Sequence, residues 1–214
     1  MKAGLLNVVR SAHAFSQSPI VPGVQEYKGD FRLNGVPARR GDLVSPGDIA
    51  STGPDSSAII IVGQHAFMLR ANSRVEFFPV YFEKEGVVSG VLKVATGAML
   101  SVFGHTQKTE ITTPLATVGI RGTGCYIDSS PERTYVCVCY GRADLGSAPT
   151  GRFLETVETS SHDLPRFIYP SGAPKLIVSA PVIDHGDDEL RLLESLVHRI
   201  PAFDEIDSPH TQRY

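Results

Sequence analysis

Two cysteines separated by one residue, Cys137 and Cys139, lie in the strand-like run RTYVCVCYGR. Successive side chains of a β-strand point to opposite faces, so these two thiols are expected to share a face. A direct disulfide between them is disfavoured, because residues two apart in a strand have Cα atoms about 6.5–7 Å apart, at or beyond the usual limit. The pair is therefore a candidate for buried packing, for half of a disulfide framework, or for two ligands of a metal ion.

The third cysteine, Cys125, precedes this pair in a predicted hairpin that closes around the turn SSPER. If Asp128 faces Thr134 across the turn, Cys125 lies directly opposite Cys137, and a register shifted by two residues places it opposite Cys139. Either register gathers three thiols on one face. A shift by one residue places Cys125 on the other face, so the hypothesis of a metal site requires one of the two convergent registers.

Three thiolates and one imidazole would complete a tetrahedral site for zinc or iron. His162, in the run SSHDLPR, is the candidate fourth ligand, with Asp163 placed to orient its ring, and His185 is the reserve. Zinc, iron or an iron-sulfur cluster is the cofactor that such a site would hold. Two alternatives stay open: the thiols are ordinary core residues, since free cysteine is among the most buried residue types, or Cys125 and Cys137 form a disulfide or a redox pair.

A glycine-rich run, GIRGTG, contains the candidate structural motif Gly119, Arg121, Gly122 and Thr123. It lacks the Lys-Ser/Thr ending of a phosphate-binding loop, and no helix is predicted after it. Its glycines are therefore expected to permit a bend or bulge in a strand, with Arg121 paired to a nearby carboxylate or carbonyl. The sequence has no G-x-S-x-G run or other nucleophile signature. We expect no catalytic residues and no enzyme activity.

Short strands separated by turn signals run from Gly29 to about Leu145, a pattern typical of all-β proteins. We expect a jelly-roll-like β-sandwich, with a rolled β-solenoid as the alternative architecture. The chain would then divide into an N-terminal arm (residues 1–28), a β domain (residues 29–145) and an irregular C-terminal extension wrapped on the sandwich (residues 146–214).

Two segments allow predictions of which residues are buried. In the strand SSAIIIV, Ile59 and Ile61 are expected to be buried and Ile60 to point to the other face. The run HGDDELRLLESLVHRIP predicts one amphipathic helix at about residues 187–200. Its apolar face consists of Leu190, Leu193, Val197 and Ile200.

Composition limits the classes of partner. The 214 residues include 20 Lys and Arg against 23 Asp and Glu, and the formal net charge of −3 comes with no basic half, so nucleic acid is not an expected partner. No segment approaches the roughly 20 consecutive apolar residues that span a bilayer, and the first apolar stretch is too short for a signal peptide.

The stretch GVPARRGDLVSPGDIASTGPDSSAIIIVGQHAFMLRANSRVEFF, followed by ITTPLATVGIRGTGCYID, resembles the FecR-type domain over roughly residues 29–145. That family carries a G…L…GD.I.TG…A.I.L stretch, then T-P-A…V-R-G-T and a final hairpin. Here Ile120 replaces the usual Val before Arg-Gly-Thr, and Gly63-Gln64-His65 replaces the usual turn. The resemblance implies a jelly-roll domain outside the cytoplasmic membrane that senses or transmits signals without catalysis. The best-known members regulate extracytoplasmic sigma factors, but only their outer domain is recognisable in this chain.

The leading hypothesis is accordingly a non-catalytic, FecR-type binding or sensory module of the bacterial cell envelope, located in the periplasm, with a protein or a small ligand as its partner. One alternative is a redox protein that carries a metal ion or iron-sulfur cluster on the hairpin cysteines. The other is a cytoplasmic structural protein, because no signal peptide is recognisable.

Overall fold

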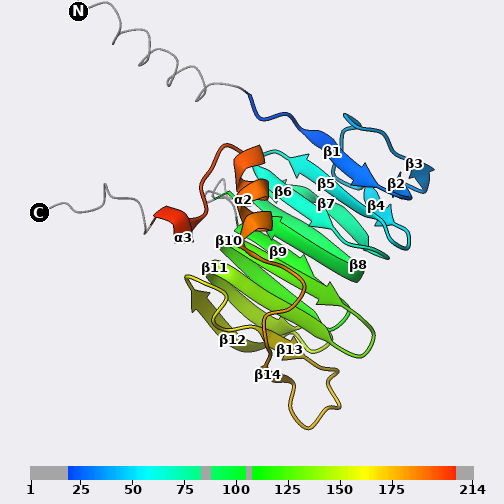
Figure 1. Cartoon of the computed structure of the whole chain (residues 1–214). Coiled ribbons are helices and arrows are strands. Elements are labelled where there is room, and N and C mark those ends of the chain that lie inside the picture. Colours follow the sequence, from blue (N-terminus) through cyan, green and yellow to red (C-terminus); the bar gives the residue numbers. More distant parts are fainter. Residues whose placement is uncertain (1–18, 83–87, 105–107, 206–214) are drawn as a thin grey trace, which may run out of the picture.

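The computed structural model describes residues 19–82, 88–104 and 108–205, so most of the predicted N-terminal arm lies outside the described residues. The chain is mostly β-structure with a helix near its C-terminal end, as the sequence predicted (Figure 1). No helix in the described part of the chain combines the length and the apolar character that crossing a bilayer requires.

The strands of the described residues are β1 (Gly23–Lys28), β2 (Phe31–Leu33), β3 (Val36–Pro37), β4 (Ile49–Thr52), β5 (Ser57–Val62), β6 (His65–Leu69), β7 (Arg74–Phe82), β8 (Val88–Val102), β9 (Lys108–Thr112), β10 (Ala116–Ser129), β11 (Thr134–Ser147), β12 (Arg152–Thr159), β13 (Arg166–Ile168) and β14 (Ile177–Ser179). The helices are α2 (Asp187–Leu196) and α3 (Ala202–Glu205).

Three long strands, β8, β10 and β11, each belong to two layers of a sandwich. The C-terminal part of β8 pairs with β6 and β10, whereas its N-terminal part pairs with β7 and β9. β11 pairs first with β13 and then with β12. The front layer therefore runs β1-β5-β6-β8-β10-β11-β13-β14, and the back layer contains β2, β3, β4, β7, β9 and β12. Strands that cross between layers at bends are typical of a sandwich rather than of the alternative solenoid.

The bends lie at glycines. β8 turns at Gly97, which has a φ of 76° that other residues rarely adopt. In β10 the register shifts between Arg121 and Gly124, within the run where the sequence predicted a bend, and Gly122 has a φ of 58°. Gly119 and Thr123 lie in the same strand, and Arg121 approaches Asp144 at 3.8 Å on the exposed side.

The main core lies between the two layers. Phe67 of the front layer packs edge-on against Phe77 of the back layer, with ring centroids 5.5 Å apart. Ile60 belongs to this core and is completely buried. Ile61 is equally buried on the opposite face of β5, while Ile59 is half-buried. The strand is thus covered on both faces, because a second apolar layer covers the outer face of the front layer.

The sheet extends past both predicted boundaries of the β domain. β1 precedes residue 29 and pairs with β5, and β12, β13 and β14 follow residue 145 as further strands of the same sheet. The segment that wraps the sandwich is therefore shorter than residues 146–214. We call residues 180–205 the lid, because this segment crosses back over the outer face of the front layer and carries α2 across β6 and β8 (Figure 1).

The helix of the lid is shorter than the sequence predicted. It begins at Asp187 as expected but ends at Leu196, where the backbone N–H groups of Val197 and Arg199 both turn back to the carbonyl of Glu194. Leu190, Leu193 and Val197 are buried, as predicted. Ile200 is 63% exposed, so the prediction that it continues the buried face was wrong.

Candidate metal centre

Strand β11 places Cys137 and Cys139 on the outer face of the front layer. Both side chains are fully buried and belong to the apolar cluster beneath the lid, together with Tyr126 of the neighbouring strand. Their shared face follows from the two-residue period of the strand, as the sequence predicted. Both are free thiols.

Cys125 does not join them. It pairs with Val138, and Tyr126 pairs with Cys137, so the hairpin has the register that is shifted by one residue. Cys125 therefore points into the main core between the layers. The expected convergence of three thiols was wrong, because the turn closes on a Ser129–Thr134 pair instead of an Asp128–Thr134 pair.

His162 reaches the cysteines from the turn between β12 and β13. Its backbone N–H donates to the carbonyl oxygen of Cys139 at 3.0 Å, which ties the turn to the edge of β11 between its two partner strands. The residue has a φ of 52°, a left-handed conformation that directs the ring toward the outer face. The predicted orienting residue, Asp163, instead contacts Thr159, whose hydroxyl donates to its carboxylate at 3.1 Å.

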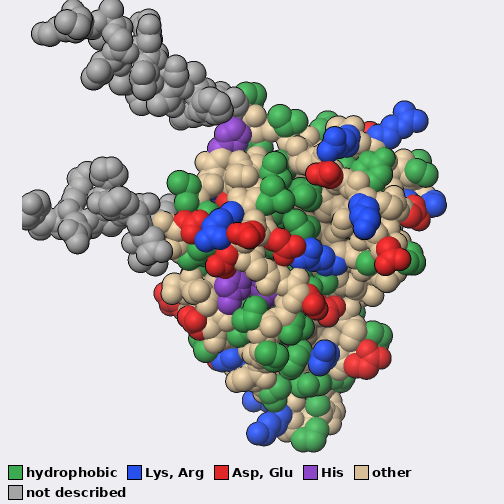
Figure 2. Space-filling view, in the orientation of Figure 1, with side chains coloured by type: hydrophobic (Ala, Val, Ile, Leu, Met, Phe, Trp, Pro, Cys, Tyr) green, Lys and Arg blue, Asp and Glu red, His purple; other side chains and the backbone are tan. Residues whose placement is uncertain are grey.

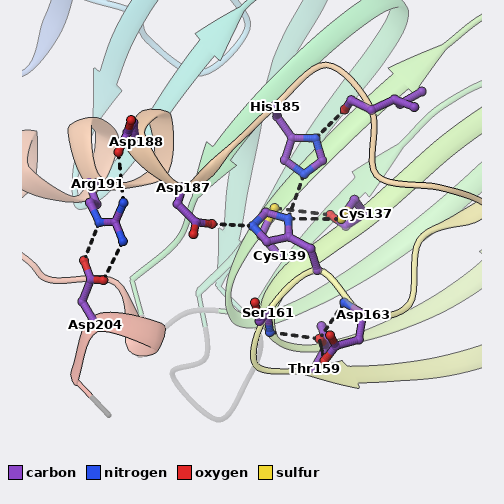
Figure 3. Close-up of polar contacts among 12 residues, drawn as sticks. Cys137, Cys139, Thr159, Ser161, Asp163, His185, Asp187, Asp188, Arg191 and Asp204 are labelled. Carbon is purple, nitrogen blue, oxygen red and sulfur yellow. Dashed lines mark hydrogen bonds and ion pairs between the residues drawn. The ribbon is translucent and has the colours of Figure 1, made fainter. Parts of the chain in front are cut away.

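His185 approaches the same point from the lid, two residues before α2 begins. Its ring stacks on Tyr126 with centroids 4.5 Å apart and planes 11° from parallel. Its Nδ1 lies 2.7 Å from the carbonyl oxygen of Ile183. The reserve ligand of the sequence prediction therefore stands beside His162, and Figure 3 shows it directed toward Cys137 and Cys139.

The potential ligand atoms of Cys137, Cys139, His162 and His185 all lie within 4.8 Å of one another. The Sγ of Cys137 is 3.6 Å from Nδ1 of His162, and that nitrogen is 3.0 Å from Nε2 of His185. Tetrahedral zinc with Zn–S near 2.3 Å and Zn–N near 2.05 Å separates its ligand atoms by about 3.3–3.8 Å. The sulfur–nitrogen distance matches that geometry, and the nitrogen–nitrogen distance is slightly shorter.

The outer nitrogen of each ring has an acceptor as its partner. His162 Nε2 lies 3.0 Å from a carboxylate oxygen of Asp187, and His185 Nδ1 lies 2.7 Å from a backbone carbonyl. Because these oxygens accept hydrogen bonds, both outer nitrogens carry the proton. In two neutral rings the inward nitrogens would then face each other as lone pairs at 3.0 Å. A positive centre, either a proton or a metal ion, must lie between them.

The electrostatics of the cluster favour a thiolate next to this positive centre. Interactions with the Cys139 thiol and with the two histidines lower the pKa of Cys137 to about 4, against the opposing effect of burial. The thiolate raises the pKa of His162 in turn, and Asp187 adds to that effect. Burial raises the pKa of Cys139, so its proton is held until a cation replaces it.

The arrangement has the ligand set of a single soft or borderline metal ion. Two sulfurs and two nitrogens in a tetrahedral arrangement are typical of zinc. The short separations suit one ion rather than an iron-sulfur cluster, which holds its ligands farther apart. The acceptors on the outer ring nitrogens are the usual partners of metal-bound histidines.

Asp187 and Tyr126 were not predicted to belong to the site. Asp187 lies in the acidic first turn of α2, where a carboxylate is favoured by the helix dipole. Its position two residues after His185 was the signal that it lies near the centre. Tyr126 had no such signal, because its face depends on the register of the hairpin.

Comparisons with known proteins assign the chain to no family. No family model and no curated protein matches the sequence. The structure is similar to two crystal structures, at 2.50 and 1.65 Å resolution, of a proposed anti-sigma factor from Parabacteroides distasonis ATCC 8503. Each aligns with a TM-score of 0.49 and 11% identity over 61% of this chain and 59% of that protein. The chain thus spans less than two thirds of that protein, and its resemblance to the FecR-type domain stays a prediction.

Proposed function

We propose that this protein is a non-catalytic binding and sensory module that holds one zinc-class metal ion through Cys137, Cys139, His162 and His185. The observation that carries the proposal is the pair of inward imidazole nitrogens, 3.0 Å apart, beside the buried sulfur of Cys137. A single proton satisfies the two nitrogens but leaves the convergence of two sulfurs unexplained. A tetrahedral ion accounts for all four side chains.

The ligand count supports a role other than catalysis. Catalytic zinc sites keep one position open for water or substrate, whereas sites with four protein ligands are closed and contribute to folding. All four ligands here come from the chain itself, and the two cysteines are buried beneath the lid. The ion would therefore join segments of the chain instead of activating a substrate.

The cellular setting follows from the FecR-type resemblance. A module of that kind would lie in the bacterial cell envelope, receive a signal and transmit it to a partner. In this proposal the metal ion is the signal or a condition for it, and the partner is a protein. Of the redox alternative, this proposal keeps the metal site on the hairpin cysteines and drops the iron-sulfur cluster.

Metal content of the purified full-length protein tests the proposal. We expect one zinc per chain by elemental analysis of protein prepared without added metal or chelator. Replacement of zinc by cobalt(II) should give the visible bands of a tetrahedral, thiolate-bound ion. Cys137→Ser, Cys139→Ser and His185→Ala should each abolish stoichiometric metal and these bands.

Cys125→Ser is the matched control, because Cys125 is an equally buried thiol on the other face of the same hairpin. It should leave one zinc per chain and an unchanged cobalt spectrum. Wild-type protein that holds less than a tenth of an equivalent of zinc, iron or copper, and that takes up no cobalt, would refute the proposal.

A further inference from the structure

The metal centre joins the sheet to the lid. Cys137 and Cys139 belong to β11, and His162 belongs to a turn that is hydrogen-bonded to β11. His185 belongs to the lid and lies next to the first turn of α2, and Asp187 of that turn binds the outer nitrogen of His162 (Figure 3). Occupancy of the centre is therefore coupled to the position of α2 on the sheet.

The lid covers an apolar surface of the front layer. Leu190, Leu193 and Val197 of the lid pack on this surface. We call the surface the outer face. Besides Cys137 and Cys139, its buried residues are Ile61, Ala66, Met68, Ala98, Leu100, Val102, Tyr126, Tyr135 and Tyr140. An uncovered patch of this kind on a soluble protein marks an interaction site.

Two polar groups at the outer face have acidic partners in the lid. Arg70, the residue directly after β6, donates to the carboxylate of Glu189 at 2.7 Å and to the carbonyl oxygen of Asp184 at 2.9 Å. The hydroxyl of Tyr140 donates to the carboxylate of Glu194, which is buried. A helix that covers the outer face as α2 does presents apolar side chains flanked by two carboxylates. Figure 2 shows acidic and basic side chains gathered over this part of the surface.

Removal of the ion weakens the closed position of the lid. Without the ion, the bonds that join His162 and His185 to the two cysteines through the metal are lost, and the two rings are linked to each other only by one proton between their inward nitrogens, 3.0 Å apart. α2 has 10 residues, and an isolated helix of that length is only marginally stable in water. Its attachment then depends on the apolar contacts and on the two carboxylates.

We propose that the metal ion controls access to the outer face, and that the uncovered outer face binds an amphipathic helix of a partner protein with the pattern of α2. That pattern has apolar residues at positions i, i+3 and i+7, which are Leu190, Leu193 and Val197 in α2 and directly after it. It has carboxylates at positions i−1 and i+4, which are Glu189 and Glu194. This inference rests on the proposed function, because the metal centre is the device that keeps the lid closed. Bound metal excludes the partner, and metal loss admits it.

A synthetic peptide of residues 187–200 is the probe for the outer face. It carries the α2 pattern but not His185, so it cannot replace that ligand. We expect the fluorescent peptide to bind chelator-treated full-length protein at least tenfold more tightly than zinc-loaded protein. Hydrogen exchange of residues 180–205 should rise in parallel with metal loss.

A charge exchange between Arg70 and Glu189 tests where the peptide binds. Protein with Arg70→Glu should lose binding of the wild-type peptide and recover it with a Glu189→Arg peptide. Leu193→Asp in the full-length protein loosens the lid without touching a metal ligand, so this variant should bind the peptide with zinc still present. Because the Leu193→Asp variant is measured with zinc present, it tests access to the outer face even if metal-free protein fails to fold.

Zinc is measured in the same samples, which separates the two proposals. Protein without zinc refutes the proposed function and this inference together. Protein with one zinc per chain whose peptide affinity is equal with and without metal, or whose Leu193→Asp variant binds no peptide, refutes this inference and leaves the metal site intact.

Discussion

At the scale of single residues, the outer nitrogens of two histidines decide the chemistry of the cluster. The carboxylate of Asp187 and the carbonyl oxygen of Ile183 each hold one ring by its N–H. Both inward nitrogens are thereby presented as ligands before any ion arrives. These two hydrogen bonds hold the rings in the orientation that metal binding needs.

We predict that Asp187→Ala weakens zinc binding by about 10–100-fold, because the carboxylate fixes the tautomer and orientation of His162. A competition titration against a chelator of known zinc affinity measures the change. Asp188→Ala is the control, since Asp188 lies in the same helical turn but is exposed and pairs with Arg191. Equal affinities of the two variants would show that Asp187 does not position the ring.

The sequence predicted the ligands better than it predicted their arrangement. The period of a strand was enough to place Cys137 and Cys139 on one face. Cys125 was misplaced because a shift by one residue reverses a face, and that shift depended on the turn geometry between Ser129 and Thr134. The proximity of His162 and His185 depends on the left-handed turn and on the path of the lid, neither of which leaves a periodic signal.

At the scale of elements, α2 shows both the reach and the limit of periodicity. The apolar positions of the run HGDDELRLLESLVHRIP predicted its start and its buried face. At its early end, after Leu196, the carbonyl of Glu194 accepts from the backbone N–H of Arg199, and the carboxylate of Glu194 accepts from the guanidinium of the same residue. That guanidinium also donates to the carbonyl oxygen of Gln64, at the β5–β6 turn, at 2.7 Å.

Leu193→Ala should reduce the free energy of unfolding by about 2–5 kcal/mol, the usual range for truncation of a buried leucine. Leu193 is completely buried between α2 and the outer face. Leu192→Ala is the matched control, because its neighbour Leu192 is 43% exposed and should change stability by less than about 0.5 kcal/mol. Urea denaturation of zinc-loaded protein measures both. A similar small effect of the two substitutions would mean that the lid is not part of the folded core.

At the scale of the whole molecule, the turn spacing predicted a sandwich but not how its layers are joined. The predicted short strands are in part halves of long strands that pass from one layer to the other. Coverage of β5 on both faces also escaped prediction, because Ile60 faces the main core and Ile61 faces the lid. An apolar run without alternation is what a strand with two covered faces produces, and SSAIIIV is such a run.

The corner of β8 is a closely packed layer crossing. A Cβ at Gly97 would lie 2.5 Å from Cα of Ser73 and 2.7 Å from the carbonyl oxygen of Asn72. The hydroxyl of Ser73 donates to the carbonyl oxygen of Ala98 at 3.0 Å and accepts from the backbone N–H of Ala98 at 2.9 Å. The chain is therefore held at this corner by contacts that leave no room for a side chain.

We predict that Gly97→Ala reduces the free energy of unfolding by about 3 kcal/mol or more, because a positive φ and a backbone clash act together. Gly63→Ala is the control: Gly63 also has a positive φ, of 59°, but its Cβ would meet no atom within 4 Å. That substitution should cost about 1–2 kcal/mol, the strain of the left-handed conformation by itself. Thermal and urea unfolding of the two variants compare them directly. Equal losses would mean that the corner can move apart to accept a methyl group, and that the two layers are less rigidly joined at β8 than the contacts with Ser73 indicate.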